Sequence, residues 1–133
     1  MRAPAVRFRI DFSNCAHVGP GKIELLEAIA RYGSLSQAAR TLGMSYRRAW
    51  LLVASLNESF RKPVTVASTG GKGGGGAAVT EFGAELIESY RALEKDFAAL
   101  AARRLGAIVP AVVPDAKSPT KATRRHLTPS GAV

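Results

Sequence analysis

Arginine and aromatic residues near the middle of the chain have the types and the spacing that contact with nucleic acid requires. Arg47 and Arg48 are adjacent, at the predicted beginning of a helix. An arginine fork can donate two hydrogen bonds to O6 and N7 of guanine, and it binds phosphates equally well. Tyr46, Trp50 and Ala54 follow one line at a spacing of four residues, and this line could face base edges and sugars. The alternative is that Trp50 packs beneath the wing of the domain as a core aromatic residue.

The charge distribution favours a polyanionic partner. The chain has 19 basic and 10 acidic residues, a net charge of +9 and a pI near 10.5. Residues 31–72 carry seven basic residues and one acid, Glu58, whereas residues 81–96 carry five acids and two bases. This reversal is expected when the first segment meets phosphates and the second meets another protein chain. The alternative is that both sets of charges lie on solvated faces by chance.

Residues 70–76 form a glycine-rich run that includes Lys72. Backbone N–H groups in such a loop can approach an anion closely, as they do in the P-loop of nucleotide-binding proteins. However, Gly73 follows Lys72, so the Ser or Thr that binds magnesium in a P-loop is missing. The β-prone residues 64–66 and 77–79 predict instead a hairpin whose tip carries Lys72 along the DNA backbone. The alternative is a slack hairpin loop without a ligand.

Residues for catalysis or metal binding are few. The histidines are His17 and His126, and Cys15 is the single cysteine, which excludes an intrachain disulfide. Cys15 and His17 could both contact one metal ion, but two ligands do not make a site. A lone cysteine beside a strand is more often a small apolar filler. No carboxylate pair stands out, so we expect no enzymatic activity, no cofactor and no metal site.

The pattern around the arginines predicts a helix-turn-helix that positions them. Apolar residues at helical spacing predict a first helix that ends at Gly33. Ser34 begins the second helix, with Gln37 three residues later in a capping-box pattern, and Gly43 ends it with the positive φ that the turn requires. Ser45 caps the third helix. The predicted inward stripe of this helix comprises Ala49, Leu52, Val53, Leu56 and Phe60.

Two further elements flank the helix-turn-helix and the hairpin. Apolar and charged residues alternate over residues 6–12, which predicts a half-buried strand. Thr80 is predicted to cap a long last helix over about 80–105. Apolar residues in that helix repeat at alternating spacings of four and three, which is typical of a coiled-coil seam. The seam comprises Leu86, Tyr90, Leu93, Phe97 and Leu100. Because a monomer would expose this stripe to water, we expect the helix to pair two subunits.

Length and composition indicate the limits of the domain. The 133 residues suit one small domain over residues 6–106, and residues 1–5 are expected to be flexible. Residues 107–133 contain four prolines and four Lys or Arg residues, which predict a disordered basic tail. The chain has no apolar run of ~18 residues and no signal-peptide stretch. We therefore expect no membrane contact and a cytoplasmic location.

The segment from Ser34 to Asn57 resembles the helix-turn-helix of LysR-type regulators and, more closely, that of ModE-type regulators. The similarity covers about residues 18–105. The closer likeness rests on Ser45-Tyr46 with Ala49-Trp50 and Asn57, on the glycine-lysine string of residues 69–77, and on Thr80 with Gly83.

The resemblance implies a winged helix-turn-helix, mainly α with a small β wing, followed by a long dimerisation helix. It also implies operator binding that regulates transcription, often of genes for molybdate uptake or molybdoenzymes. ModE-type regulators carry a C-terminal oxyanion-binding region, whereas a proline-rich tail follows Gly106 here, so we expect either a separate effector-sensing protein or a response to the regulator's own abundance. The residues expected to contact DNA are Ser34, Ser36, Gln37, Ser45, Tyr46, Arg47, Arg48, Trp50 and Lys72.

These observations together predict a homodimeric regulator that binds double-stranded DNA as an inverted repeat, with half-sites ~34 Å apart or a multiple of that distance. One alternative is an interaction module that modulates another regulator through the long helix without binding DNA. A second alternative is a nucleotide-dependent enzyme that uses the glycine loop, which the missing P-loop Ser or Thr and the missing acid/base pair disfavour.

Overall fold

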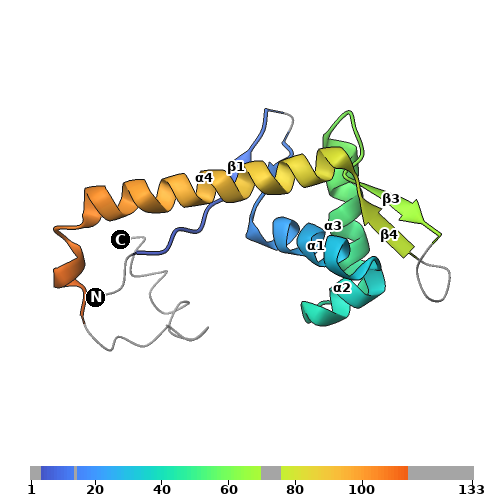
Figure 1. Cartoon of the computed structure of the whole chain (residues 1–133), viewed down its shortest axis with the longest axis horizontal. Coiled ribbons are helices and arrows are strands. Elements are labelled where there is room, and N and C mark those ends of the chain that lie inside the picture. Colours follow the sequence, from blue (N-terminus) through green and yellow to red (C-terminus); the bar gives the residue numbers. More distant parts are fainter. Residues whose placement is uncertain (1–3, 14, 70–75, 114–133) are drawn as a thin grey trace, which may run out of the picture.

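A computed structural model describes residues 4–13, 15–69 and 76–113. Three helices and a β-hairpin form a head, and one long helix runs across the head and extends beyond it (Figure 1). This arrangement confirms the predicted fold class, mainly α with a small β wing and a long last helix. In chain order the elements are β1 (Ile10–Asp11), β2 (His17–Val18), α1 (Pro20–Tyr32), α2 (Leu35–Thr41), α3 (Tyr46–Ser59), β3 (Thr65–Ser68), β4 (Gly76–Val79), α4 (Glu81–Leu105) and the 3-10 helix η2 (Val109–Ala111).

The core of the head consists of two apolar clusters, and helix α1 contributes to both. One cluster lies beneath α4 and includes Val18, Leu56 and Tyr90, and the other lies between α1, α2 and α3 and includes Ala38 and Ala49. Pro20 occupies the first turn of α1, where the missing N–H costs no helical hydrogen bond. Ile23 faces the cluster beneath α4, and Leu25 faces the cluster formed with α2 and α3; both side chains are fully buried. The helix ends at Gly33, which has a φ of +67° and donates its N–H to the Ile29 carbonyl at 2.8 Å. The predicted end of this helix is therefore confirmed.

Helices α2 and α3 and the turn between them form the predicted helix-turn-helix. The Ser34 hydroxyl oxygen accepts a hydrogen bond from the Gln37 N–H at 3.1 Å, and that of Ser45 accepts one from the Arg48 N–H at 3.1 Å. Both predicted N-caps are thus confirmed. Gly43 in the turn has a φ of +70°, as predicted. Small buried residues let the helices approach each other closely: Ala38, Ala39 and Ala49.

Strands β3 and β4 pair as an antiparallel hairpin, which we call the wing. The register pairs Thr65 with Val79 and Ser68 with Gly76. This confirms the predicted hairpin, although its strands extend a little beyond the β-prone residues at the tip. Lys72, the predicted cation of the wing tip, lies outside the described residues.

Hydrogen bonds attach the wing to the helix-turn-helix. The side-chain amide oxygen Oδ1 of Asn57, near the end of α3, accepts a hydrogen bond from the Val64 N–H at 2.7 Å. The Ala77 N–H of β4 donates to the Gly33 carbonyl, between α1 and α2, at 3.0 Å. Because buried polar groups need such partners, these two bonds determine how the wing lies relative to α3.

The N-terminal segment forms less sheet than predicted. Only Ile10–Asp11 pairs, with His17–Val18, instead of a strand over residues 6–12. The alternation in this segment nevertheless reflects burial, because Phe8 packs on α4. Its ring centroid lies 4.9 Å from that of Tyr90, and the Tyr90 hydroxyl donates a hydrogen bond to the Phe8 carbonyl at 2.7 Å. A helix, rather than a second strand, covers the apolar side of this segment.

Two contacts hold α4 against the head. Thr80 caps the helix as predicted, with its hydroxyl oxygen accepting a hydrogen bond from the Gly83 N–H at 2.9 Å, and Gly83 itself is buried against the backbone of Val64. Farther along, the Arg91 guanidinium donates to both carboxylate oxygens of Glu27 on α1, at 2.7 and 3.0 Å. These hydrogen bonds hold the pKa of Glu27 below its usual range. The direction in which α4 leaves the head is therefore defined at two places.

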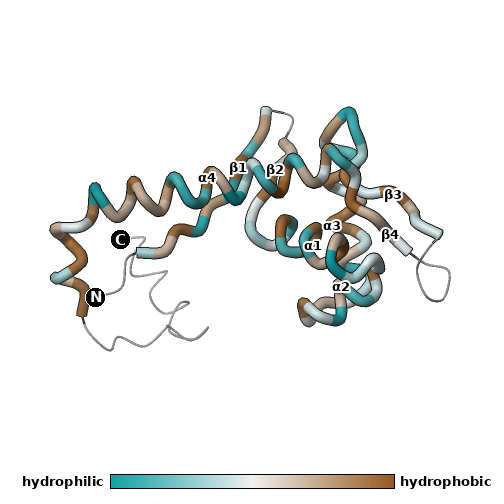
Figure 2. The backbone as a smooth tube through the Cα atoms, viewed as in Figure 1, coloured by the Kyte–Doolittle hydropathy of each residue, from teal (hydrophilic) through white to brown (hydrophobic). Residues whose placement is uncertain are grey.

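Beyond the head, hydrophobic and hydrophilic residues alternate along α4, and the hydrophobic character continues into η2 (Figure 2). The predicted tail from residue 107 therefore begins with a short 3-10 helix that the sequence pattern does not reveal. Residues 114–133 of that tail and residues 1–3 lie outside the described residues. No helix in the described ranges is long and apolar enough to cross a membrane.

Candidate nucleic-acid interface

Helix α3 presents one face to the core and the opposite face to solvent. Its predicted inward stripe, from Ala49 to Phe60, packs into the two apolar clusters, with Ala49 and Leu56 fully buried. The solvent face begins with Arg47 and Arg48 in the first helical turn. This polarity is required of a recognition helix, which must be supported from behind and accessible in front.

Arg47 and Arg48 are both exposed. Neither forms an ion pair with any other residue in the part of the chain that the structure describes. Both guanidinium groups are therefore available to an external anion or to a base edge. Four more exposed cations lie on the same head, namely Arg31, Arg40, Arg61 and Lys62.

Trp50 is not a core residue. Its exposed fraction is 53%, and that of Tyr46, one turn earlier, is 56%. The interpretation of Trp50 as a buried aromatic is therefore wrong, because Ala49 and its inward neighbours already fill the space behind α3. Leu51, which the sequence analysis did not select, is also exposed, at 48%. The predicted inward stripe of α3 omits Leu51, so the helical period was the signal that could have placed it on the outer face.

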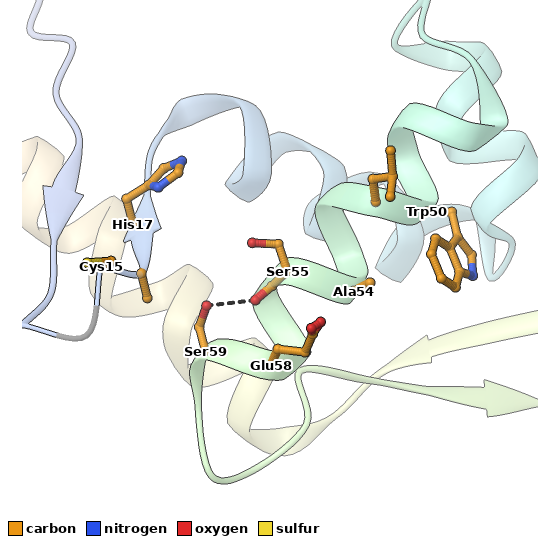
Figure 3. A pocket seen from close by; sticks show the side chains of 9 residues that line it. Cys15, His17, Trp50, Ala54, Ser55, Glu58 and Ser59 are labelled. Carbon is orange, nitrogen blue, oxygen red and sulfur yellow. Dashed lines mark hydrogen bonds between the residues drawn. The ribbon is translucent and has the colours of Figure 1, made fainter.

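Trp50 stands between two open grooves. One groove, with a volume of about 440 Å³, lies between α3 and the β1–β2 connection, and its walls include Leu51, Ala54 and Glu58 (Figure 3). The other, of about 360 Å³, lies between α3 and the wing and includes Tyr46 and Val66. The indole is thus a ridge on the solvent face of α3, with a hollow on either side.

The Cys15 and His17 side chains line the first groove (Figure 3). Cys15 is exposed and has a φ of +69°, so its interpretation as a small apolar filler is wrong. The β1–β2 connection needs a tight turn here, and the thiol remains outside the core. Within the described ranges, no three His, Cys, Asp or Glu side chains are placed to hold a metal ion.

The remaining predicted DNA-contacting residues lie at the beginnings of α2 and α3. The Ser34 and Ser45 hydroxyl oxygens accept capping hydrogen bonds, which leaves each hydroxyl hydrogen free to donate. Ser36 and Gln37 are exposed in the first turn of α2. All four remain predictions as DNA contacts.

Lys22 is a buried cation that the sequence analysis missed. Only 6% of the residue is exposed. Its ammonium donates to the His17 carbonyl at 3.0 Å and to the Ser55 hydroxyl of α3 at 3.4 Å. Burial, and then the nearby charge of Arg9, lowers the pKa of Lys22. Through these two hydrogen bonds, Lys22 of α1 connects this helix to β2 and to α3. A lysine near a helix start is normally solvated, so the sequence carries no signal for this burial.

The predicted seam of α4 is divided between two environments. Leu86 packs against the apolar cluster of the head, and Tyr90 is only 4% exposed beneath Phe8. Leu93 and Leu100 remain exposed, at 43% and 40%, on the part of α4 that leaves the head. Phe97 is 44% exposed, although one side of its ring stacks on that of Phe8 at 5.4 Å. The seam therefore serves the chain's own core first and is free only toward its end.

A helix-turn-helix, a wing hydrogen-bonded to its second helix, and unpaired arginines at the beginning of that helix define a winged helix-turn-helix DNA-binding domain. Residues 21–84 match the model of the bacterial regulatory helix-turn-helix protein, lysR family. These residues therefore form a lysR-family helix-turn-helix DNA-binding domain. The description of this family is that of regulatory proteins.

Curated relatives relate the domain to ModE proteins. The chain is 44% identical over 71 residues to the DNA-binding transcriptional dual regulator ModE of Escherichia coli (strain K12), and these residues are 53% of this chain and 27% of that protein. It is 37% identical over 97 residues to the molybdenum transport protein ModE of Azotobacter vinelandii, and the aligned region is 70% of this chain and 36% of that protein. The molybdenum-pterin-binding protein MopA of Rhodobacter capsulatus is 49% identical over 77 residues, 58% of this chain and 29% of its own length. The chain thus spans about a third of the length of these relatives.

Proposed function

We propose that the protein is a sequence-specific transcriptional regulator that acts in the cytoplasm and inserts the beginning of α3 into the major groove of DNA. The observation that carries this proposal is the pair Arg47 and Arg48, exposed and without an ion pair among the described residues, on a helix whose rear is buried. The other exposed cations of the head would add sequence-independent attraction to phosphates.

The relatives suggest which genes are regulated. The names of the similar proteins refer to molybdenum transport, to molybdenum-pterin binding and to DNA-binding regulation. We therefore propose control of genes for molybdate transport or molybdoenzymes. We also propose that the partner of this regulator is a separate protein that senses the effector.

The operator experiment begins with enrichment of duplexes by the purified protein and measures affinity at several salt concentrations. If Arg47 or Arg48 contacts a base edge, its replacement by alanine is expected to cost about 1–3 kcal/mol and to relax specificity at one position. If it contacts phosphate, affinity falls uniformly across sequences and the salt dependence becomes shallower.

The double variant Arg103→Ala/Arg104→Ala is the matched control. It removes the same charge from exposed positions in the last turn of α4, away from α3. It is expected to bind the operator nearly as well as the wild type. If the Arg47→Ala/Arg48→Ala protein keeps its affinity, the proposed recognition helix is wrong.

We further propose that the free part of the α4 seam pairs two subunits. Leu93 and Leu100 are seven residues apart and exposed on the same side of α4. Burying such leucines against a second helix removes apolar surface from water. The variant Leu93→Glu/Leu100→Glu is expected to be monomeric in light scattering and to bind an inverted repeat much more weakly.

The variant Ala92→Glu/Ala99→Glu provides the control for the dimer. It introduces the same charges at the same spacing, on exposed positions one residue away from each leucine. It is expected to remain dimeric. A wild-type protein that is monomeric at micromolar concentration would contradict the dimer proposal.

The exposed end of α4 also suits a second function, an interaction module that modulates another regulator without contacting DNA. In that case the purified protein fails to enrich any duplex at physiological salt, and the Leu93→Glu/Leu100→Glu variant loses a protein partner.

A further inference from the structure

The solvent face of α3 changes character after its first turn. Arg47 and Arg48 begin the face, but the next outward residues, Trp50 and Leu51, are apolar and about half exposed. Ala54, one turn further, lines both grooves beside the indole. The middle of this face therefore offers an aromatic edge and aliphatic carbon to whatever it contacts.

Two polar side chains farther along α3, those of Ser55 and Asn57, form hydrogen bonds within the fold, and the exposed carboxylate of Glu58 follows near the end of the helix. The Asn57 amide uses its oxygen for the Val64 N–H at 2.7 Å and its nitrogen for the Thr65 hydroxyl at 3.2 Å. The Ser55 hydroxyl accepts a hydrogen bond from Lys22 at 3.4 Å. The described part of α3 thus presents no unengaged amide for the two-bond recognition of adenine.

The floor of the major groove has one apolar group, the 5-methyl of thymine. Where a helix presents a tryptophan and a leucine to this groove, those two side chains can distinguish bases through that methyl group. The unpaired arginines at the same end of the helix favour a polyanion over an apolar protein surface as the occupant.

We propose that Trp50 and Leu51 recognise thymine 5-methyl groups in each half-site, and that Arg47 and Arg48 contact the adjacent phosphates or guanines. The methyl groups would lie in the hollow bordered by Trp50, Leu51 and Ala54. This inference rests on the proposed function, because it requires α3 to lie in the major groove.

The test removes only the methyl groups. Each thymine of an enriched operator is replaced in turn by deoxyuridine, which keeps the base pairing and the hydrogen-bonding groups. Because burial of one methyl group contributes about 0.8 kcal/mol, the wild-type protein is expected to lose affinity about fourfold at one or two positions of each half-site. The Trp50→Ala and Leu51→Ala proteins are expected to bind the two duplexes equally at those positions.

Leu105→Ala is the matched control, since Leu105 is an exposed aliphatic residue, at 43%, at the end of α4 and away from α3. This control variant is expected to show the same fourfold loss of affinity as the wild type when thymine is replaced by deoxyuridine. A measurement on the unaltered protein makes the test independent of variant folding. Trp50 is the single tryptophan, so its fluorescence is expected to become protected from acrylamide quenching when the operator binds.

The outcomes separate the inference from the function on which it rests. If the wild type binds its operator but every deoxyuridine duplex binds within twofold of the original, the methyl recognition is wrong and the regulator proposal stands. If Trp50 remains fully quenchable in the DNA complex, the apolar face serves another protein and the inference is again wrong. If no duplex is enriched at all, both proposals fail.

Discussion

Replacement of Gly83 by alanine tests how closely α4 must approach the wing. A Cβ atom at this position would collide with the carbonyl oxygen of Val64 and lie 2.7 Å from Cγ1 of Val79. The collision can be relieved only by a shift of the backbone, because the atom nearest to the new Cβ belongs to the backbone carbonyl group of Val64. That carbonyl also accepts the Thr80 N–H at 2.9 Å, so any shift weakens the hydrogen bond that precedes α4.

The magnitude follows from three contributions. Overpacking of this kind costs about 1–3 kcal/mol, and weakening of one hydrogen bond costs about 1 kcal/mol. Alanine is a better helix former than glycine and returns about 1 kcal/mol. The Gly83→Ala protein is therefore expected to lose about 1–3 kcal/mol of its free energy of unfolding. For a folded domain of roughly 100 residues, this corresponds to a decrease in Tm of at least about 4 °C.

Thermal and urea denaturation followed by circular dichroism would measure this effect, with Gly21→Ala as the control. Gly21 also lies in a helix, α1, but a Cβ atom there meets no atom within 4 Å. That substitution is expected to leave stability unchanged or raise it by up to about 1 kcal/mol. Equal or greater stability of Gly83→Ala relative to the wild type would refute the close-packing argument.

Three further predictions concern hydrogen bonds. Ser45→Ala removes the oxygen that accepts the Arg48 N–H and is expected to cost about 0.5–2 kcal/mol in urea denaturation; an unchanged midpoint would contradict this role. Because the pKa of Lys22 is lowered on folding, the unfolded chain binds more protons, and stability should rise with pH from the lowered pKa up to 10.5. Denaturation curves across that range should show the wild type gaining stability relative to Lys22→Met, and parallel curves would disprove the assignment. Tyr90→Phe removes the hydrogen bond to the Phe8 carbonyl and should cost about 0.5–1.5 kcal/mol, with faster amide hydrogen exchange in the N-terminal segment; unaltered exchange would show that the bond is dispensable.

Local signals in the sequence predicted the elements of the head well. Glycines with positive φ at 33 and 43 and hydroxyl caps at Ser34, Ser45 and Thr80 act within a few residues, so their types suffice to predict helix ends. Features that depend on distant partners were not predictable. The alternation of the N-terminal segment could not show that a helix, rather than a strand, covers Phe8.

In the candidate interface, too, features that depend on neighbouring residues were predictable and features that depend on distant contacts were not. The position of Arg47 and Arg48 at the beginning of α3 follows from the cap and the helical period, and their exposure agrees with it. The outward position of Trp50 depends on which side of α3 packs on α1 and α2, and an aromatic residue fits either side. The buried ammonium of Lys22 donates hydrogen bonds to residues of β2 and of α3, and no short sequence pattern encodes contacts between such distant elements.

The joint between α4 and the head has a consequence for operator architecture. Arg91 with Glu27, and Gly83 against Val64, determine the angle at which α4 projects. In a dimer joined through α4, this angle sets how far apart the two copies of α3 stand. Substitutions at the joint would then alter the number of base pairs between half-sites that a dimer accepts, while the preferred bases within each half-site stay the same.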